Sequence, residues 1–311
     1  MRMRLTRRDL CKGVLATGSA LRLGVGQTKM FKLGIITDEL TGKLEDALPF
    51  ITGYHLHWCE LREMWGKNIM NLSKEELDHA KKLIDDAGLR VSDIGSPIFK
   101  WNLPQMPAKA GEKRDEYKAS FVESDADRLL QQSFDLARHF GTRTVRIFSY
   151  WRVDEPEKAY QFVRDRLAQA AQVAAKNDMI LVLENEHTCN IGTGKEMGHL
   201  LKDIHSPALR GNWDPGNAAM LDEVPFPNGY EAMKGLFSHM HIKDVRKKTA
   251  TGKKEWAAVG EGIIDWKGQM QALRTDGYDG TMSLETHYLR ADGNKVESTR
   301  ESLEGLLKLL A

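Results

Sequence analysis

Short runs of apolar and β-branched residues alternate with stretches of helical periodicity from Lys32 to the end of the chain. Strands that are joined by helices return to the same edge of a sheet and therefore run parallel. The unit repeats eight times, which predicts a single (β/α)8 TIM barrel over residues 30–311. Strands are expected at about 31–37, 54–61, 90–95, 143–149, 179–185, 209–214, 239–244 and 280–286, and helices at about 41–51, 73–88, 121–140, 155–177, 194–204, 230–237, 265–275 and 297–310.

An open, doubly wound sheet is the structural alternative. Such a sheet usually has a glycine-rich phosphate turn after its first strand, whereas here that strand ends in Ile36-Thr-Asp-Glu-Leu. Two long connections, 96–120 and 247–262, leave the C-terminal ends of predicted strands. Because this end is the catalytic face of a barrel, such loops often form lids or substrate walls. Residues 247–256 are expected to form a hairpin or a flexible flap.

Residues 1–29 differ from the rest of the chain in charge. They hold seven basic residues and one acidic residue, so the remainder carries a net charge of −5, against +1 for the whole chain. Thr6-Arg-Arg-Asp-Leu-Cys-Lys resembles a twin-arginine (Tat) export signal, which predicts a periplasmic protein. A basic N-terminus without signal function, and hence a cytoplasmic protein, is the alternative. The acidic remainder argues against nucleic acid as a partner, and no apolar run approaches the ~20 residues of a membrane span.

Four side chains that can bind a metal stand at the ends of the last four predicted strands. The C-terminal ends of parallel barrel strands meet at one mouth, so these groups are expected to converge there. Three carboxylates and one imidazole would bind a single divalent metal ion, with Mn²⁺ favoured and Mg²⁺, Co²⁺ or Zn²⁺ as alternatives. The four residues are separated by 30, 27 and 44 positions and are Glu184, Asp214, His241 and Glu285.

The motifs around these positions resemble those of the xylose isomerase-like TIM-barrel superfamily of sugar isomerases and epimerases. The resemblance covers about residues 31–310. It implies that the same four residues hold one divalent metal, and that Glu184 and Glu285 also serve as an acid/base pair. The matching pieces are Cys59-Glu-Leu-Arg, Leu183-Glu-Asn, Asp214-Pro-Gly-Asn, His239-Met-His-Ile-Lys-Asp, Gly260-Glu-Gly-Ile-Ile-Asp-Trp and Ser283-Leu-Glu.

One position departs from the superfamily pattern. Many relatives have a histidine three residues after the aspartate of the sixth strand, where this chain has Asn217. The trinuclear zinc nucleases of the superfamily use that histidine and several others, so the resemblance does not favour DNA repair. Asn217 is expected to bind a sugar hydroxyl or to cap its turn. His239 is a weaker ligand candidate than His241, and Glu186 is the substitute if Glu184 faces away.

Other polar and aromatic residues near the mouth are candidates, each with a structural alternative. Lys243 could stabilise an oxyanion or act as an acid, or it could pair with a carboxylate. Trp101 could stack on a sugar or anchor its loop. The remaining substrate-binding candidates are Glu60, Arg62, Lys100 and Glu261, while His187 and His287 are expected at the rim, Arg146 inside the barrel with a carboxylate, and Cys59 and Cys189 as buried thiols.

These features predict a metal-dependent isomerase or epimerase that acts on a sugar or keto-sugar. A hydroxy-ketone can chelate a metal, and a carboxylate can then remove the proton next to the carbonyl to give an enediolate. An alternative keeps this step and expels a leaving group, as a lyase or dehydratase acting on an oxidised (3-keto) glycoside or polyol would. A carbohydrate-binding barrel without turnover and an endonuclease acting at abasic sites are further hypotheses. The expected partner is a small carbohydrate, and a homo-oligomer is left open.

Overall fold

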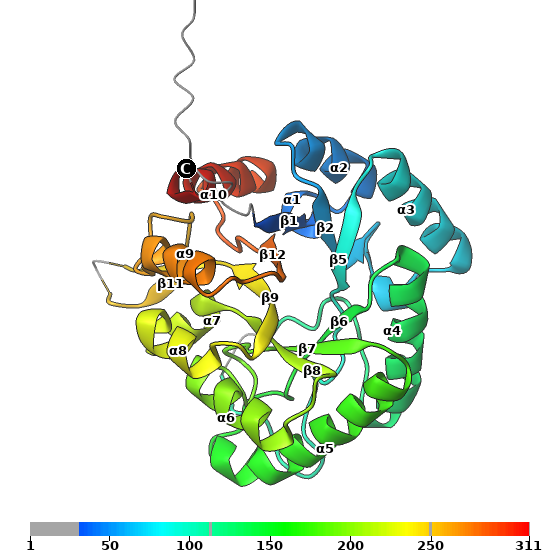
Figure 1. Ribbon diagram of the computed structural model, residues 1–311, viewed down its shortest axis with the longest axis vertical. Coiled ribbons are helices and arrows are strands. Elements are labelled where there is room, and N and C mark those ends of the chain that lie inside the picture. Colours follow the sequence, from blue (N-terminus) through cyan, green and yellow to red (C-terminus); the bar gives the residue numbers. More distant parts are fainter. Residues whose placement is uncertain (1–30, 112–113, 249–250, 311) are drawn as a thin grey trace, which may run out of the picture. The chain divides into compact units, whose positions relative to one another are not determined.

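The computed structural model describes residues 31–310 except 112–113 and 249–250, so the predicted export signal at 1–29 lies outside the described residues. Eight parallel strands close into a barrel in the order β1-β12-β9-β8-β7-β6-β5-β2 (Figure 1), which confirms the predicted (β/α)8 fold over the open sheet. The barrel strands are β1 (Lys32–Ile36), β2 (Trp58–Leu61), β5 (Arg90–Ile94), β6 (Thr144–Ile147), β7 (Ile180–Glu184), β8 (Leu209–Trp213), β9 (Phe237–Ile242) and β12 (Thr281–Leu284).

Helices surround this barrel on the outside (Figure 1). The larger ones are α2 (Leu44–Gly53), α3 (Lys74–Asp86), α4 (Ala126–Phe140), α5 (Pro156–Lys176), α6 (Gly194–Ile204), α9 (Trp266–Thr275) and α10 (Lys295–Leu310). Short helical segments are α1 (Thr37–Leu40), α7 (Pro215–Met220), α8 (Tyr230–Met233), η1 (Ile69–Asn71), η2 (Glu123–Asp125) and η3 (Pro225–Gly229).

Helix α4 illustrates how the sequence forms a covering helix. Its apolar residues recur on one face, and it buries Leu129, Leu130, Phe134 and Ala137 against the barrel. Gly141, in the left-handed region at φ 75°, ends the helix as its sequence predicts. The covering helices therefore follow directly from the 3.6-residue periodicity.

The two cysteines predicted as buried thiols, Cys59 and Cys189, are buried and form no disulfide.

Two predicted elements begin at least four residues later than expected. The strand expected at 54–61 starts only at Trp58, because the chain first closes α2 with a turn in which His55 adopts φ 58°. The helix expected at 121–140 becomes α-helical at Ala126, after the short 3-10 turn η2. Turns of this kind depend on single residues and leave no periodic signal.

One predicted helix is too long at its C-terminal end. The helix expected at 230–237 stops at Met233, and Gly235 (φ 75°) then reverses the chain. The reversal lets β9 begin at Phe237, two residues before its predicted start. The earlier start lengthens the strand that carries the central histidines of the barrel.

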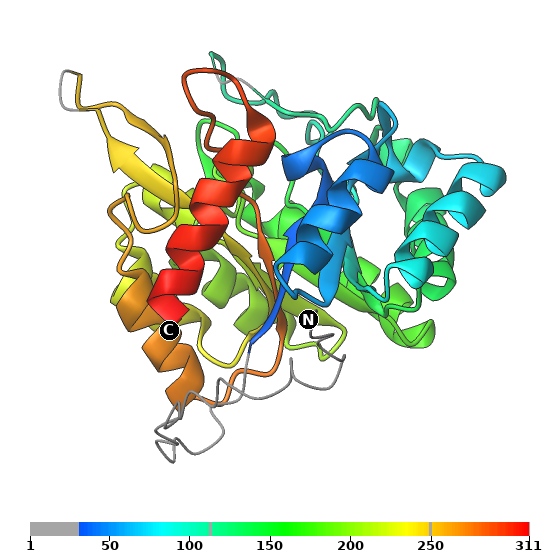
Figure 2. The same ribbon diagram turned by 90° about the horizontal axis from the view of Figure 1, so that it is seen from above.

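Two small hairpins follow barrel strands. The pair β3 (Glu63–Met64) and β4 (Lys67–Asn68) follows β2, and the pair β10 (Asp244–Lys247) and β11 (Lys254–Ala257) follows β9. The second pair confirms the hairpin expected at 247–256. Figure 2 shows it projecting from the same end of the barrel as the long connection that follows β5. Both long connections thus stand at one end of the barrel.

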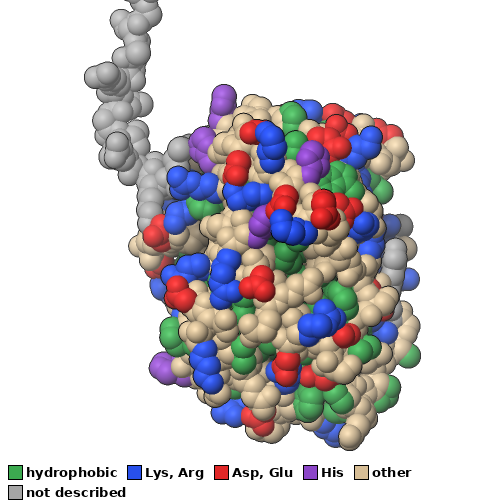
Figure 3. Space-filling model, turned by 90° about the vertical axis from the view of Figure 1, so that its right-hand side faces the viewer, with side chains coloured by type: hydrophobic (Ala, Val, Ile, Leu, Met, Phe, Trp, Pro, Cys, Tyr) green, Lys and Arg blue, Asp and Glu red, His purple; other side chains and the backbone are tan. Residues whose placement is uncertain are grey.

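The outer helix surfaces carry charges of both signs. In α3, Lys74 pairs with Asp78 and Lys82 with Asp86, each at 2.5 Å and four residues apart. Acidic and basic side chains lie interspersed over the face shown in Figure 3. Exposed pairs of this kind contribute little to stability because water screens them. In the described part of the chain, no helix is both long and apolar enough to cross a membrane.

Candidate metal centre

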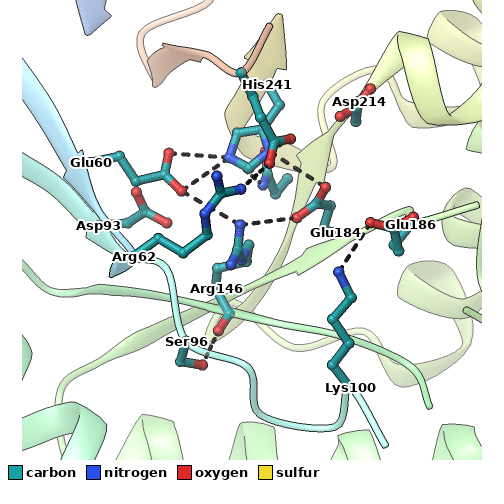
Figure 4. A network of polar contacts seen from close by, with 12 residues as sticks. Glu60, Arg62, Asp93, Ser96, Lys100, Arg146, Glu184, Glu186, Asp214 and His241 are labelled. Atoms are coloured by element: carbon teal, nitrogen blue, oxygen red, sulfur yellow. Dashed lines mark hydrogen bonds and ion pairs between the residues drawn. The ribbon is translucent and has the colours of Figure 1, made fainter. Parts of the chain in front are cut away.

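Four side chains meet at the C-terminal ends of consecutive barrel strands. They are Glu184 at the end of β7, Asp214 after β8, His241 in β9 and Glu285 after β12. Each offers one oxygen or nitrogen atom, and these four atoms all lie within 4.8 Å of one another. All four side chains are fully buried. Figure 4 shows Glu184 beside His241, with Asp214 on the next strand end. The strand-end spacing in the sequence therefore does bring these four groups together.

The turn after β8 orients Asp214 through hydrogen bonds. Asp214 is the N-cap of α7, and its Oδ1 accepts a hydrogen bond from the backbone N–H of Asn217 at 2.8 Å. Its own backbone N–H donates to Oδ1 of Asn185, also at 2.8 Å. Pro215 occupies the first turn of α7, where its missing N–H costs nothing. The Asp-Pro-Gly-Asn motif thus fixes one carboxylate oxygen and leaves the other for the cluster.

Gly216 brings this turn close to β9. A Cβ atom at this position would lie 2.8 Å from the carbonyl oxygen of Lys243. We expect Gly216→Ala to lower the free energy of unfolding by about 1–3 kcal/mol, because backbone must move to admit the methyl group, and to weaken metal binding by displacing Asp214. Chemical denaturation and a metal titration measure the two effects. Gly53→Ala, where no atom lies within 4 Å, is the matched control; equal behaviour of the two variants would contradict the close-packing argument.

The four groups fit a divalent cation chemically. Buried polar atoms in proteins almost always have hydrogen-bond partners. Within the described residues, each of the four side chains has one buried atom that makes no hydrogen bond of good geometry and faces only charged groups: Glu184 Oε2, Asp214 Oδ2, His241 Nδ1 and Glu285 Oε2. Oxygen donors with one imidazole suit Mg²⁺, Mn²⁺, Co²⁺ or Zn²⁺. Their role as metal ligands remains a prediction that this geometry supports.

A buried lysine bridges two of the four groups. The Lys243 ammonium lies 3.0 Å from Asp214 Oδ2 and 2.7 Å from Glu285 Oε2. Burial raises the pKa of Asp214, and the nearby charge of Lys243 lowers it. The negative charges of Glu184 and Glu285 raise it further, and the resulting pKa is about 6. The carboxylate pairing expected as the structural alternative for Lys243 is therefore present. Its predicted catalytic role stays a prediction.

Arg62 holds Glu285 from the other side. Its guanidinium donates to Glu285 Oε1 at 2.5 Å, to Asp38 Oδ2 at 2.7 Å and to Glu39 Oε1 at 2.8 Å. Burial raises the pKa of Glu285, but the nearby positive charges, Lys243 foremost, outweigh burial and hold this pKa well below its usual range. Glu285 is therefore an ionised carboxylate. The guanidinium of Arg62 is occupied by these carboxylates. The expected contact between Arg62 and a substrate remains a prediction.

Arg146 lies inside the barrel beneath the cluster, as predicted. Its Nη1 lies 3.4 Å from Glu184 Oε2 and 3.7 Å from Glu60 Oε1 (Figure 4), and all three side chains are fully buried. The guanidinium also lies over the rings of Tyr117 and Phe148, at 5.1 and 4.8 Å. Arg146 thus compensates two buried carboxylates that come from different strands.

Glu60 accepts contacts from two histidines in the barrel interior. Its Oε2 lies 3.1 Å from Nε2 of His239 and 3.1 Å from Nε2 of His241. Asp93 lies beside Glu60 in Figure 4, and burial together with the charge of Glu60 raises its pKa to about 7. A carboxylate at Nε2 orients the His241 ring so that Nδ1 faces Glu184 and Glu285, at 3.5 and 3.1 Å. The predicted contact of Glu60 with substrate stays untested.

Residues after β7 form a polar chain at the rim. Lys100 pairs with Glu186 at 3.3 Å, and Nδ1 of His187 lies 2.7 Å from the same carboxylate. His187 also contacts Oδ1 of Asn217 at 2.9 Å, and Asn217 donates to Glu184 Oε1 at 3.1 Å. The predicted positions of Lys100, His187 and Asn217 beside the mouth therefore agree with the structure. Glu186 belongs to this chain and lies outside the four-atom cluster.

Trp101 packs as a loop anchor. Its indole Nε1 donates to Glu123 Oε2 at 3.1 Å, and its ring packs on Phe99 and Tyr150, with centroids 5.6 and 6.4 Å apart. The side chain is buried, and its described partners do not include the four clustered residues. These contacts fit the structural alternative for Trp101 better than sugar stacking.

Glu261 lies exposed in a groove beside α10. Its loop is held instead by Asp244, whose Oδ2 accepts from the backbone N–H groups of Gly260 at 2.9 Å and Gly262 at 3.2 Å. A Cβ on Gly262 would collide with the Asp244 carboxylate. The Gly-Glu-Gly motif therefore shapes a loop around Asp244, and the structure does not bring Glu261 to the cluster.

Three residues at the mouth were not among the site residues predicted from the sequence. Asp38 and Glu39 follow β1 and bind Arg62, although their segment carries no distinctive motif. Trp256, in a basic stretch typical of a solvated loop, lies against the mouth. The signal that could have found the two acids is their place after an apolar strand, as for the four predicted ligands.

The fold and the clustered residues define a (β/α)8 barrel with a candidate metal centre at its mouth. Residues 56–309 match the model of the xylose isomerase-like TIM barrel family, and the chain belongs to that family. A search of curated proteins gave no significant match.

Solved structures with the same fold include an epimerase, a probable dehydratase and a zinc-bound protein. The 3-keto-D-glucoside 4-epimerase YcjR from E. coli in its apo form has 16% identity and a TM-score of 0.64, over 90% of this chain and 100% of that chain. The probable 3-DHS dehydratase AsbF from Bacillus anthracis has 18% identity and a TM-score of 0.65, over 86% and 97%. The IOLI protein with a bound zinc atom has 13% identity and a TM-score of 0.67, over 90% and 98%.

A xylose isomerase-like TIM barrel/4-hydroxyphenylpyruvate dioxygenase fusion protein is also similar, with 17% identity and a TM-score of 0.68. The match covers 90% of this chain but only 42% of the fusion protein. At these identities the similarity of all four structures shows the fold. Substrate and reaction must be argued from the residues of the present chain.

Proposed function

We propose that this protein is a divalent-metal-dependent isomerase or epimerase of a sugar or keto-sugar. The observation that carries the proposal is the meeting of four buried donor atoms, from Glu184, Asp214, His241 and Glu285, within 4.8 Å of one another. A divalent ion bound there would polarise a substrate carbonyl and stabilise negative charge on its oxygen. The zinc-bound relative and the keto-glucoside epimerase among the similar structures support this proposal.

Two glutamates are proposed to move the proton. Glu184 and Glu285 come from β7 and β12, with β8 and β9 between them in the barrel, so they approach the mouth from different directions. Both carboxylates face buried positive charge, Glu184 beside Arg146 and Glu285 between Lys243 and Arg62, which favours the ionised form that accepts a proton. One glutamate removes the proton next to the carbonyl, and the other returns one to the enediolate. Return on the opposite face inverts a stereocentre, and return to the adjacent carbon isomerises the sugar.

The charge of the mouth favours an uncharged substrate. The three clustered carboxylates exceed the charge of one divalent ion, and Glu60 and Glu186 add further negative charge. Arg62 also pairs with Asp38 and Glu39, so seven carboxylates face one divalent ion and four paired cations, Lys100, Lys243, Arg62 and Arg146, which is −7 against +6. An anionic group such as phosphate would therefore meet cations whose charge is already compensated.

Solvent exchange tests the reaction directly. With Mn²⁺ bound, the protein should exchange one carbon-bound hydrogen of a neutral ketose or methyl 3-keto-glucoside for deuterium in D₂O. Glu285→Gln should slow this exchange by about 10²–10⁴-fold, because the amide cannot accept the proton. Proton NMR follows the exchange, and Glu231→Gln on the exposed face of α8 is the control. Undiminished exchange by Glu285→Gln would overturn the assignment of the base.

Elimination is the second candidate reaction. For this reaction we propose the buried Lys243 ammonium, 2.7 Å from Glu285, as the acid that protonates the departing oxygen after the same proton abstraction. A probable dehydratase is among the similar structures. Release of water or an aglycone from a 3-keto-glycoside, with loss of that release in Lys243→Met, would favour this reaction. Appearance of an isomeric sugar alone would favour isomerisation.

The metal and the location are also proposed. The donor set supports Mn²⁺ as the ion, with Mg²⁺, Co²⁺ and Zn²⁺ as alternatives. The twin-arginine motif at Thr6–Lys12 supports export, and neutral sugars or glycosides suit a periplasmic enzyme.

A further inference from the structure

One aromatic side chain lies over the mouth of the barrel. The ring of Trp256, on β11, has its centroid 5.0 Å from the Lys243 ammonium. The rings of His187 and His287 meet it nearly edge-on, with centroids 5.7 and 5.5 Å away. These three neighbours follow β7, β9 and β12, and His287 Nε2 lies 3.2 Å from Glu285. Trp256 therefore spans the strand ends that carry three of the four clustered groups.

The hairpin holds this indole in place. Trp256 pairs with Val245 across β10 and β11. The adjacent Lys254 ammonium donates to the carbonyl oxygens of Ala219 at 2.6 Å and Met220 at 3.2 Å, which ties the hairpin to the end of α7. Because Asp214 caps the N-terminus of α7, the hairpin and one of the clustered carboxylates belong to the same packed unit.

Trp256 differs in solvent exposure from the residues beneath it. The four clustered side chains have no exposed surface, whereas Trp256 is partly exposed. A substrate that enters past His187 and His287 therefore meets this ring before it reaches the carboxylates. The flat face of an indole is apolar, as is the C–H face of a sugar ring, and the two surfaces bury each other well.

We propose that Trp256 is the substrate-stacking residue of the site and the cover that separates the metal centre from solvent. The stacking part rests on the proposed reaction, and the cover part rests on the proposed metal centre together with the geometry above. Trp256 thus selects ligands that offer an apolar ring face next to a carbonyl and a hydroxyl group.

Metal release tests the cover without relying on activity. The protein is loaded with Zn²⁺ and mixed with excess EDTA, and release is followed with a chromogenic indicator. Trp256→Ala should release the metal about tenfold faster than the parent, because the path to solvent opens, while Trp256→Leu should stay near the parent rate. Trp65→Ala is the control, since Trp65 is another partly exposed tryptophan on a hairpin, stacked on His79. Equal rates for Trp256→Ala and the parent overturn the cover.

The kinetics of deuterium exchange test the stacking. Trp256→Leu, which fills the space without an aromatic ring, should raise the KM of a neutral ketose or methyl 3-keto-glucoside about tenfold, corresponding to about 1.4 kcal/mol of lost binding. Trp256→Phe should recover most of the affinity. An unchanged KM in Trp256→Leu overturns stacking and leaves the proposed function intact.

Absence of exchange by the metal-loaded parent overturns the proposed function instead. In that case binding of the same sugars is measured by titration calorimetry. Binding by the parent that is weakened in Trp256→Leu and recovered in Trp256→Phe still supports stacking, and equal binding or no binding overturns it.

Discussion

Asp214→Ala should purify without bound divalent metal, whereas the parent should hold about one ion per chain. The substitution removes one of the three carboxylates. It also leaves the Lys243 ammonium, which lies 3.0 Å from Asp214 in the parent, without that partner, so its positive charge would repel a metal ion at the remaining ligands. Mass spectrometry of protein dialysed against Mn²⁺, Co²⁺ or Zn²⁺ and then against buffer measures the content.

The matched control for this substitution is Asp135→Ala, which removes an exposed carboxylate of α4 that pairs only at the surface with Arg138. It should keep the parent's metal. A parent that binds none of the three ions would mean that the four strand-end residues serve only the fold, and the isomerase proposal would then give way to a carbohydrate-binding role.

Arg146→Met should lower the free energy of unfolding of the metal-free protein by about 3–5 kcal/mol. Arg146 is fully buried and faces Glu184 and Glu60, so its loss leaves two carboxylates without their cation. Urea denaturation measures the change. Arg138→Met, which removes an arginine of an exposed pair, should change stability by less than about 1 kcal/mol.

A second substitution identifies the cause. Combining Arg146→Met with Glu184→Gln should recover part of the lost stability, because one uncompensated charge is removed with its partner. Additive losses in the double variant would show that Arg146 acts through packing against Tyr117 and Phe148, rather than through charge.

The barrel and the meeting of four residues were predictable because both depend on periodic features. A strand must be apolar and a helix must bury one face, so the eight units leave a regular signal. The positions of Glu184, Asp214, His241 and Glu285 follow from those units, since each stands where a predicted strand ends. Parallel closure then brings them together without any further information.

The contacts that tune these residues were not predictable in the same way. Glu60 and His241 are 181 positions apart, and their pairing depends on the direction of side chains inside the closed barrel. Trp256 carries no periodic signal, because the hairpin places it by backbone pairing and by the anchor of Lys254 on α7. Turn conformations such as that of His55 also depend on single residues, and this explains the strand predicted four residues too early.

Complete burial of the four clustered side chains has a kinetic consequence. Under the proposed cover, an ion beneath the Trp256 ring would exchange only as often as the cover opens, so an ion acquired while the chain folds would be replaced slowly, during prolonged dialysis. Affinity for divalent ions rises from manganese to copper in almost any donor set. With slow exchange, an ion bound during folding would be retained even where another ion binds more tightly at equilibrium. For a chain exported already folded, as the motif at Thr6–Lys12 predicts, the metal would be chosen on the side of the membrane where synthesis takes place.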